Sequence, residues 1–286
     1  MRRVILSWSS GKDSAWALHL LREMPDVQVV ALFTTFNSSA DRVAMHAVRR
    51  TLVEAQAERS NLPLWSAELP WPCSNAVYED AMTAICQRAV AERVTEIAFG
   101  DLFLQDIRDY RERQLRGTGL SPLFPVWHLP TDELATEMIR AGVRAKVTCL
   151  DPAKLERCFA GREFDRAFLE SLPPTVDPCG ENGEFHTFVY ESPVFSRPIP
   201  TKTGEVIERD GFVFVDVLPN GALDGPQTQG RSHAGLCATC LNSKIVTSDR
   251  GSVFYRCMLS DENPEFARYP RLPVLTCSGW ERSTPQ

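Results

Sequence analysis

The first 170 residues alternate between short apolar runs and segments whose apolar residues recur at helical spacing. The apolar runs, which have strand character, lie at 4–8, 27–35, 64–69 and 94–99. The helical segments between them lie at 14–22, 43–60 and 76–92. Single strands separated by helices predict parallel β-α units, because successive parallel strands need a crossover connection. The sequence therefore predicts an α/β fold with a parallel sheet, whose ligand site lies beyond the carboxyl ends of the strands.

The second part of the chain has a different pattern. A strand near residue 123, a helix at 131–141 and a strand at 143–150 continue the alternation. The stretch 193–218 is rich in proline and β-branched residues and predicts a β-hairpin. Residues 219–235 contain Asn-Gly and Asp-Gly-Pro and have no apolar pattern, which is typical of a linker.

These changes of pattern predict the domain boundaries. A length of 286 residues favours two domains, or one domain with an appendage. We predict a first domain at 1–121, a smaller α+β domain at 122–218, the linker at 219–235 and a small cysteine-rich module at 236–286.

Composition excludes several classes of protein. Apolar residues make up 43% of the chain and charged residues 24%, as in globular proteins, and the net charge of −6 argues against a nucleic-acid partner. The longest strongly apolar stretch, 27–36, is about half of a membrane span, and the N-terminus runs into a strand without a signal-peptide pattern. We therefore predict a cytoplasmic protein without a membrane partner, in which the nine cysteines are thiols or metal ligands.

The junction between the first strand and the first helix is a candidate phosphate-binding turn. It consists of Ser9, Ser10, Gly11, Lys12, Asp13 and Ser14. Small residues let the backbone approach an anion, and the start of a helix offers free amide groups and the positive end of a dipole. Lys12 adds a point charge, Asp13 can hold Mg²⁺, and Ser14 can cap the helix or bind phosphate. The spacing differs from that of a Walker loop, and an ordinary capped turn is the alternative.

This junction resembles the Ser-Gly-Gly-x-Asp-Ser motif of the PP-loop ATP pyrophosphatases. Only Ser10 departs from the motif, at a position where the family usually has glycine. The resemblance implies a Rossmann-like sheet of the HUP type with helices on both faces. It also implies that residues 9–14 bind ATP, that Lys12 and Asp13 are catalytic, and that ATP is cleaved to AMP and pyrophosphate. Enzymes of this superfamily adenylate a carbonyl or carboxyl oxygen, which a nitrogen or sulfur nucleophile then displaces.

Two further segments narrow the resemblance to one branch of that superfamily. Residues 99–108 follow the fourth strand, and residues 177–187 carry a Gly-Glu-Asn-Gly-Glu-Phe-His-Thr sequence. Together they are similar to the diphthine–ammonia ligases, whose pattern includes Gly-Glu-x-Gly-Glu-Tyr/Phe-x-Thr. His186 stands where these ligases often carry an acidic residue. The likeness spans residues 3–218 and implies ammonia and an unidentified carboxyl-bearing acceptor, either a small molecule or a protein, as partners.

Five residues of these segments are candidates for the acceptor side of the site. Gly100 permits close backbone approach, and the Asp101 carboxylate can bind Mg²⁺ or orient a nucleophile. Arg108 directly follows the site loop and is assigned to the polyphosphate or to an acidic acceptor. With the resemblance, Glu181 and Glu184 are placed in the acceptor or ammonia pocket. On the residues alone, the alternatives are a strand-ending turn, a solvated basic face and a hydrophilic turn before a hairpin.

The C-terminal module is distinguished by its cysteines. It contains Cys237, Cys240, Cys257 and Cys277. A Cys-x-x-Cys turn and two further thiolates can chelate one tetrahedral ion, for which we expect zinc before an iron–sulfur cluster. Unligated buried cysteines are the alternative. A module this small needs a metal ion or docking onto the enzyme to be stable.

Three functions are consistent with these patterns. The first is an ATP-dependent, AMP-forming ligase that uses ammonia, in which Lys12, Asp13, Asp101, Glu181 and Glu184 do the catalytic work. The second is a PP-loop enzyme that modifies RNA, against which the negative charge argues. The third is a non-catalytic nucleotide sensor whose cysteine module binds proteins, against which the Gly-Glu segment argues. A homodimer is compatible with all three.

Overall fold

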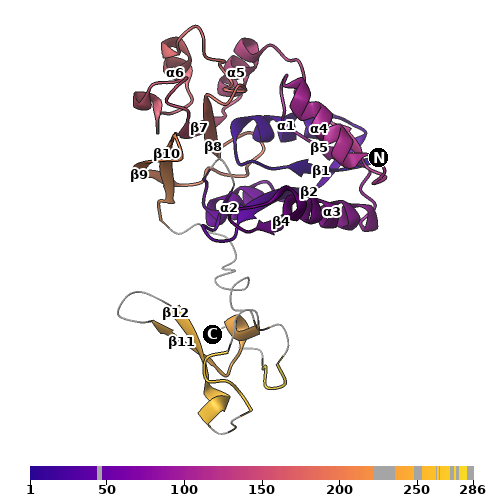
Figure 1. Ribbon diagram of the computed structural model, residues 1–286, viewed down its shortest axis with the longest axis vertical. Coiled ribbons are helices and arrows are strands. Elements are labelled where there is room, and N and C mark those ends of the chain that lie inside the picture. Colours follow the sequence, from indigo (N-terminus) through magenta and orange to yellow (C-terminus); the bar gives the residue numbers. More distant parts are fainter. Residues whose placement is uncertain are drawn as a thin grey trace. The chain divides into compact units, whose positions relative to one another are not determined.

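The computed structural model describes residues 1–43, 47–221, 236–247, 253–261, 263, 265–270, 274 and 277–281 (Figure 1). The chain divides into two compact units, residues 1–223 and 224–286. Of the predicted linker, residues 222–235 lie outside the described part of the chain.

The first sheet is built mainly from parallel β-α units. Its strands are β1 (Arg2–Ser7), β2 (Val27–Asn37), β3 (Arg42–Val43), β4 (Leu64–Leu69), β5 (Glu96–Ala98) and β6 (Ser121–Leu123). β1 and β4 pair with opposite edges of β2, since Leu32 and Phe33 have a partner in each of them. β5 and β6 continue the sheet in parallel beyond β1, whereas β3 pairs antiparallel with the end of β2. The predicted α/β fold is confirmed, with a sheet that is mixed rather than wholly parallel.

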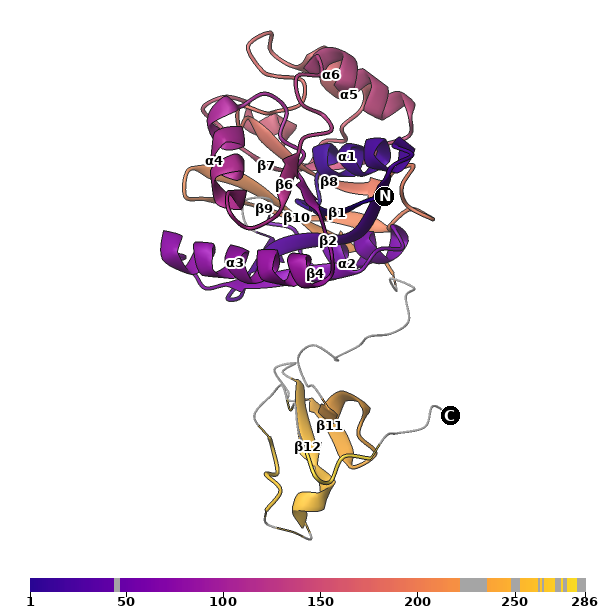
Figure 2. The ribbon, with the colours of Figure 1, turned by 90° about the vertical axis from the view of Figure 1, so that its right-hand side faces the viewer.

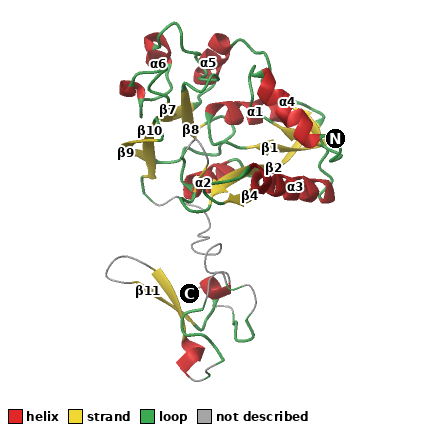
Figure 3. Ribbon diagram, viewed as in Figure 1, coloured by secondary structure: helices red, strands yellow, loops and turns green. Residues whose placement is uncertain are grey.

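Helices cover both faces of this sheet, as Figure 3 shows. They are α1 (Lys12–Glu23), α2 (Arg50–Arg59), α3 (Asn75–Ala91) and, near the β6 edge, α4 (Gln105–Leu115). Side chains of a strand point alternately to opposite faces. Val4 and Leu6 of β1 accordingly pack in one apolar cluster with α1 and α2, and Ile5 packs in a second cluster with α3. The sheet is thereby fixed between two cores, and the loops at its carboxyl edge are held in place.

A second sheet completes the N-terminal unit. It has the order β8-β7-β10-β9, with α5, α6 and a 3-10 turn packed around it (Figure 2). Its elements are α5 (Thr131–Arg140), β7 (Arg144–Leu150), η1 (Arg157–Phe159), α6 (Arg166–Ser171), β8 (Phe185–Glu191), β9 (Thr201–Arg209) and β10 (Phe212–Pro219). β9 and β10 form the predicted hairpin, closed by a two-residue turn in which Asp210 and Gly211 both have positive φ. β8 contacts α1, which brings this sheet against the first.

One predicted helix is shorter than expected. The helix predicted over 43–60 begins only at Arg50, after the short strand β3; residues 44–46 lie outside the described part. The backbone at Ala47 has a φ of 53°, which is not helical, and Arg42 and Arg49 on either side both bind Asp216 of β10, at 2.8 and 2.5 Å. These ion pairs tie the segment before α2 to the second sheet.

The C-terminal unit is a small hairpin with turns around it. Its described elements are η2 (Leu236–Thr239), β11 (Ser243–Thr247), β12 (Val253–Cys257) and η3 (Met258–Asp261). β11 and β12 pair antiparallel. In neither unit do the described helices include one that is long and apolar enough to span a membrane.

Candidate functional site

A polar cavity of about 220 Å³ lies beyond the carboxyl ends of β1 and β5. Four parts of the chain line it: the turn after β1, the loop after β5, Arg111 of α4, and the segment that leads into β8 together with the first residues of that strand. Its lining includes Ser9, Lys12, Asp13, Ser14, Gly100, Asp101, Arg111, Glu181 and His186. Side chains far apart in the sequence therefore meet at the edge where a parallel sheet binds its ligands.

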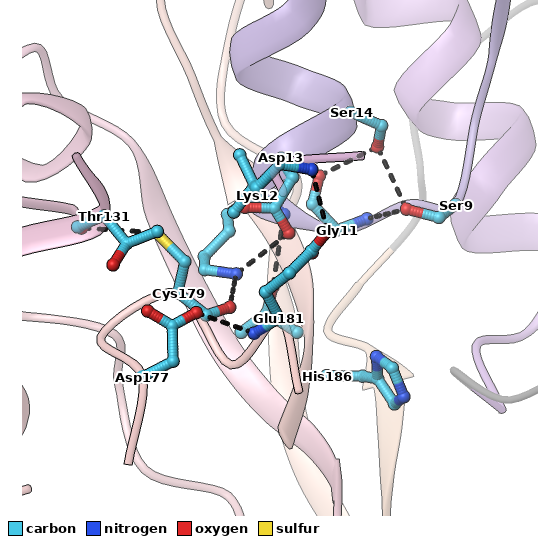
Figure 4. Close-up of polar contacts among 12 residues, drawn as sticks. Ser9, Gly11, Lys12, Asp13, Ser14, Thr131, Asp177, Cys179, Glu181 and His186 are labelled. Atoms are coloured by element: carbon cyan, nitrogen blue, oxygen red, sulfur yellow. Dashed lines mark hydrogen bonds and ion pairs between the residues drawn. The ribbon is translucent and has the colours of Figure 1, made fainter. Parts of the chain in front are cut away.

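The turn after β1 has an unusual backbone. Ser10 has a φ of 72°, in the left-handed region that glycine adopts most easily, and its side chain is fully buried. The hydroxyl groups of Ser9 and Ser14 lie 3.2 Å apart, and the Ser14 hydroxyl donates to the Gly11 carbonyl at 2.9 Å (Figure 4). Gly11 is the N-cap of α1. The turn thus presents two hydroxyls beside the positive end of the helix.

Strand β8 and a buried glutamine hold this turn. The Lys12 amide donates to Thr187 Oγ1 at 3.1 Å, and the Val189 amide donates to the Ser10 carbonyl at 3.0 Å. Gln56 of α2 is fully buried; its amide group donates to the carbonyls of Ser10 and Val189 and accepts from the Trp8 indole. Gln56 was not among the site residues predicted from the sequence. Its only signal was a polar residue on the apolar face of a predicted helix.

Lys12 does not point freely into the cavity. Its side chain is 1% exposed, and its ammonium group donates to the Cys179 carbonyl and pairs with Asp13 at 2.9 Å (Figure 4). The ammonium also lies 5.6 and 5.3 Å from the ring centres of Phe164 and Phe185. Lys12 therefore joins the turn after β1 to the loop before β8, rather than standing as the free point charge that the sequence suggested.

Asp13 is the carboxylate of the cavity wall that pairs with Lys12. Burial raises its pKa, although the Lys12 ammonium opposes the shift. Its Oδ2 atom carries the ion pair, whereas Oδ1 is buried and has no hydrogen-bond partner among the described residues. A buried oxygen without a partner is costly unless a cation or a ligand completes the site.

The loop after β5 comes very close to the turn. A methyl group on Gly100 would lie 3.1 Å from the Asp13 carbonyl carbon and the Ser14 nitrogen, so only glycine fits without a shift. Burial raises the pKa of the neighbouring Asp101, against the opposing charge of Arg111. The Arg111 guanidinium lies 3.4 Å from Asp101 and stacks over the Phe99 ring.

Arg108, which the sequence analysis selected for the phosphate, does not line this cavity. It pairs with Glu112 at 2.8 Å and lies over the rings of Phe124 and Trp127. Arg111 is about one helical turn further along α4, and it does line the cavity. Helical periodicity alone could not choose between them, because it did not show which face of α4 meets the loop.

The two glutamates of the Gly-Glu segment have different surroundings. Glu181 lines the cavity and accepts a hydrogen bond from the Leu102 amide at 2.7 Å. Burial raises its pKa to about 7, helped by the charge of Asp13. Glu184 lies outside the cavity and is 3% exposed. Its Oε1 atom accepts from the Asp177 amide and from the Asn182 side chain, so it braces the loop, while Oε2 is buried without a partner among the described residues.

A second and larger cavity, of about 820 Å³, lies between α3 and α4. It is mostly apolar and includes Met82, Cys86 and Val90. Phe99 and Arg111 line both cavities and form the wall between them. The lining of the larger cavity contains none of the turn residues 9–14, which gather at the smaller one.

The four C-terminal cysteines are free thiols and only partly buried. Burial and the neighbouring thiols Cys240, Cys277 and Cys257 raise the pKa of Cys237. Among the described residues, however, no three His, Cys, Asp or Glu side chains are arranged to hold a metal ion. The arrangement of the described side chains therefore does not by itself show the predicted metal site.

Two family models match most of the chain. The model of the diphthamide synthase N-terminal domain matches residues 1–122, and the model of the C-terminal domain matches residues 130–216. Proteins from cattle, rat and human, each named diphthine–ammonia ligase, are 25%, 26% and 25% identical to the chain. Each of these alignments covers 75% of this chain and 88% of the relative. The turn, the cavity and these matches agree: the chain belongs to the diphthamide synthase family of PP-loop proteins.

Proposed function

We propose that this chain is an ATP-dependent, AMP-forming ligase that activates a carboxyl group of an acceptor and transfers it to ammonia. The observation that carries the proposal is the composition of one cavity. It joins the anion-binding turn at Ser9–Ser14 to a carboxylate, Glu181, whose pKa is about 7. The names of the curated relatives, which specify ammonia as a ligase substrate, support the same reaction class.

ATP would lie with its phosphates over the turn and the start of α1. The hydroxyls of Ser9 and Ser14 and the positive end of the helix face that space. Gly100 packs against the backbone of Asp13 and Ser14, so the loop after β5 limits the cavity on the other side.

The donor set fits a magnesium ion. Mg²⁺ is bound in nucleotide sites by one or two carboxylates together with phosphate oxygens and water. Asp13 Oδ1 is buried without a partner among the described residues, and Asp101 lines the same cavity. These two carboxylates would hold the ion, which when bound neutralises charge on the polyphosphate.

Arg111 is the cation that we assign to the pyrophosphate. Lys12 is already committed to Asp13 and to the Cys179 carbonyl, whereas the Arg111 contact with Asp101 is long, at 3.4 Å. The Arg111 side chain is 22% exposed and lines the cavity. Guanidinium groups bind phosphate oxygens in pairs, so Arg111 can stabilise the charge that the leaving pyrophosphate gains.

The reaction has two steps. An oxygen of the acceptor carboxylate attacks the α-phosphorus, the bond to the bridging oxygen breaks, and pyrophosphate leaves. Glu181 in its ionised form then takes a proton from ammonium, and the resulting ammonia attacks the acyl carbon and expels AMP. The apolar cavity beyond Phe99 and Arg111 offers room for the body of the acceptor.

The assay that tests the proposal follows the nucleotide product. Purified full-length chain is incubated with α-labelled ATP, Mg²⁺ and ammonium, with and without a panel of carboxylic acids and peptides. AMP and pyrophosphate are the expected products. ADP would exclude a pyrophosphatase, and tight ATP binding without turnover under all conditions would favour the nucleotide sensor. AMP formation that depends on RNA instead of a carboxylate would favour the RNA-modifying alternative.

Two arginines on α4 provide a matched comparison. Arg111→Ala should raise the KM for ATP and lower AMP formation by about 10²-fold, the loss typical for one group aimed at developing charge. Arg108→Ala removes an arginine from the same helix but outside the cavity, and ATP use should be unchanged. Equal effects of the two variants would remove Arg111 from the proposed phosphate site.

A further inference from the structure

The described residues of the C-terminal unit include no buried apolar core like that of the N-terminal unit. Every fully buried hydrophobic residue of the described chain lies at or before Val217. In the C-terminal unit, Leu241 is 62% exposed, Ile245 60% and Phe254 47%. A unit of this size without a core needs a cross-link, a metal ion or a partner to remain folded. The described cysteines of the unit are free thiols, so no disulfide supplies the cross-link.

Backbone hydrogen bonds bring three separate cysteine-bearing segments to one end of the β11–β12 hairpin. The Ser243 amide donates to the Cys240 carbonyl at 3.2 Å, and Ser243 is the strand partner of Cys257. The Met258 amide donates to the Asn242 carbonyl at 2.8 Å. The Cys-x-x-Cys turn and the end of β12 are therefore neighbours.

The third segment, around Cys277, is attached to the same place. The Trp280 indole donates to the Leu236 carbonyl at 2.9 Å, next to Cys237 in the chain. The Leu241 amide donates to the Glu281 carbonyl at 2.7 Å, and the Asn242 side chain donates to the Gly279 carbonyl at 3.2 Å. A methyl group on Gly279 would collide with Leu259 and with the Phe266 ring, so this turn packs tightly on the residues that follow β12.

We propose that Cys237, Cys240, Cys257 and Cys277 close around one zinc ion, and that this site takes the place of a core in the C-terminal unit. The four residues come from three chain segments that meet at one end of the hairpin. Four thiolates are a preferred ligand set for structural zinc. Each thiol that binds loses its proton to the solvent, so up to four protons are released per ion. Because no three of these side chains yet stand at ligand spacing, binding must draw the sulfur atoms together.

The test measures metal on the full chain. Protein dialysed against metal-free buffer should retain about one zinc ion per chain by elemental analysis. Cys237→Ser and Cys257→Ser should each lower this by at least tenfold. Cys158→Ser is the matched control, because Cys158 is an exposed thiol of the N-terminal unit, and its zinc content should match that of the wild type. Unchanged zinc in both test variants would overturn the proposal.

A second measurement avoids variants that fail to fold. The wild-type chain is treated with a chelator and titrated with Co²⁺, which should give the intense thiolate charge-transfer and tetrahedral visible bands of a four-sulfur site at one equivalent. Hydrogen exchange of the β11–β12 amides should speed up when zinc is removed and recover when it is restored, while β1 amides remain unchanged. Octahedral Co²⁺ spectra, labile sulfide with iron, or β11–β12 protection that is indifferent to the chelator would each contradict the zinc site. None of these outcomes bears on the ligase proposal, because the catalytic cavity belongs to the other unit.

Discussion

The two units of the chain differ in how their polar groups are supported. Residues 1–221 enclose two apolar clusters, and around them stand buried polar groups such as Gln56, Lys12 and Glu184. The described residues of 236–281 contain no fully buried side chain, and the contacts that define them are backbone hydrogen bonds at one end of a hairpin. A unit with a large core can keep strained or unpartnered groups at its site, because many contacts share the cost. The stability of a unit without such a core depends on a small number of hydrogen bonds.

The largest expected effect concerns the buried pair in the N-terminal unit. Asp13→Asn should lower AMP formation by about 10³-fold, because the carboxylate proposed for Mg²⁺ is lost and electrostatic groups of this kind carry such factors. It should also reduce the free energy of unfolding by about 3 kcal/mol, since the Lys12 ammonium remains buried without its ion-pair partner.

Kinetics with α-labelled ATP measure the loss of AMP formation in Asp13→Asn, and thermal unfolding measures its loss of stability. Asp106→Asn, on the exposed first turn of α4, serves as the control and should change neither. The zinc content of Asp13→Asn should equal that of the wild type if the two units are independent. Wild-type AMP formation in this variant would remove Asp13 from the site.

The second effect is a pH dependence. Glu181 has a pKa of about 7, so the rate of amide formation should rise as the pH passes through that value and the base form appears. Glu181→Gln should be about 10²-fold slower and lack this limb of the profile. Glu184→Gln is the matched control in the same loop; it should lower stability but keep the wild-type profile.

The same shift has a consequence for stability. Since burial raises the pKa of Glu181 in the folded state, its ionisation favours the unfolded chain. Protonated Glu181 adds to the free energy of unfolding at low pH, and this contribution is lost as the pH rises through about 7. At pH 8, Glu181→Gln should therefore be more stable than the wild type by up to about 2 kcal/mol. Denaturant unfolding at pH 5 and pH 8 measures the difference, and equal gains at both values would argue against the raised pKa.

A third change tests how well the core supports the turn. Gln56→Ala removes three buried hydrogen bonds, those to the Trp8 indole and to the carbonyls of Ser10 and Val189; the Ser10 carbonyl keeps only its bond from the Val189 amide. We expect a loss of about 3 kcal/mol, because each buried polar group without a partner costs about 1–3 kcal/mol. Gln28→Ala, on the exposed surface of β2, should cost less than about 0.5 kcal/mol. Equal losses would mean that water replaces Gln56 without penalty.

The spacing of apolar residues predicted much of the architecture, because it shows directly which face of a strand or helix is buried. The alternation of strands and helices located the first sheet, and the turn after β1 was found from its small residues and its place in the pattern. Arg108 was the predicted phosphate ligand, whereas Arg111 is the arginine of α4 that lines the cavity; which of them does so depends on how α4 packs against the loop after β5. Gln56 and the buried position of Lys12 were also out of reach, since both depend on contacts with β8 and Cys179, more than 130 residues away in the chain.

The smallest effect concerns Ser10, where the chain departs from the glycine of the family motif. Its φ of 72° costs a residue with a side chain about 1 kcal/mol, and its hydroxyl is buried without a partner among the described residues. Ser10→Gly should therefore raise the free energy of unfolding by about 1 kcal/mol while AMP formation persists, because the contacts of residue 10 with Gln56 and Val189 use only its backbone carbonyl. Ser10→Ala separates the effect of the hydroxyl from that of the backbone strain, since it removes the hydroxyl but keeps the strain.

Asp210→Gly, at an exposed turn with a φ of 53°, is the control: it relieves backbone strain where no hydroxyl is buried, and it should gain only a few tenths of a kcal/mol. If Ser10→Gly were less stable than the wild type, the serine hydroxyl would have to contribute more than the backbone strain costs, and a role for it at the site would follow.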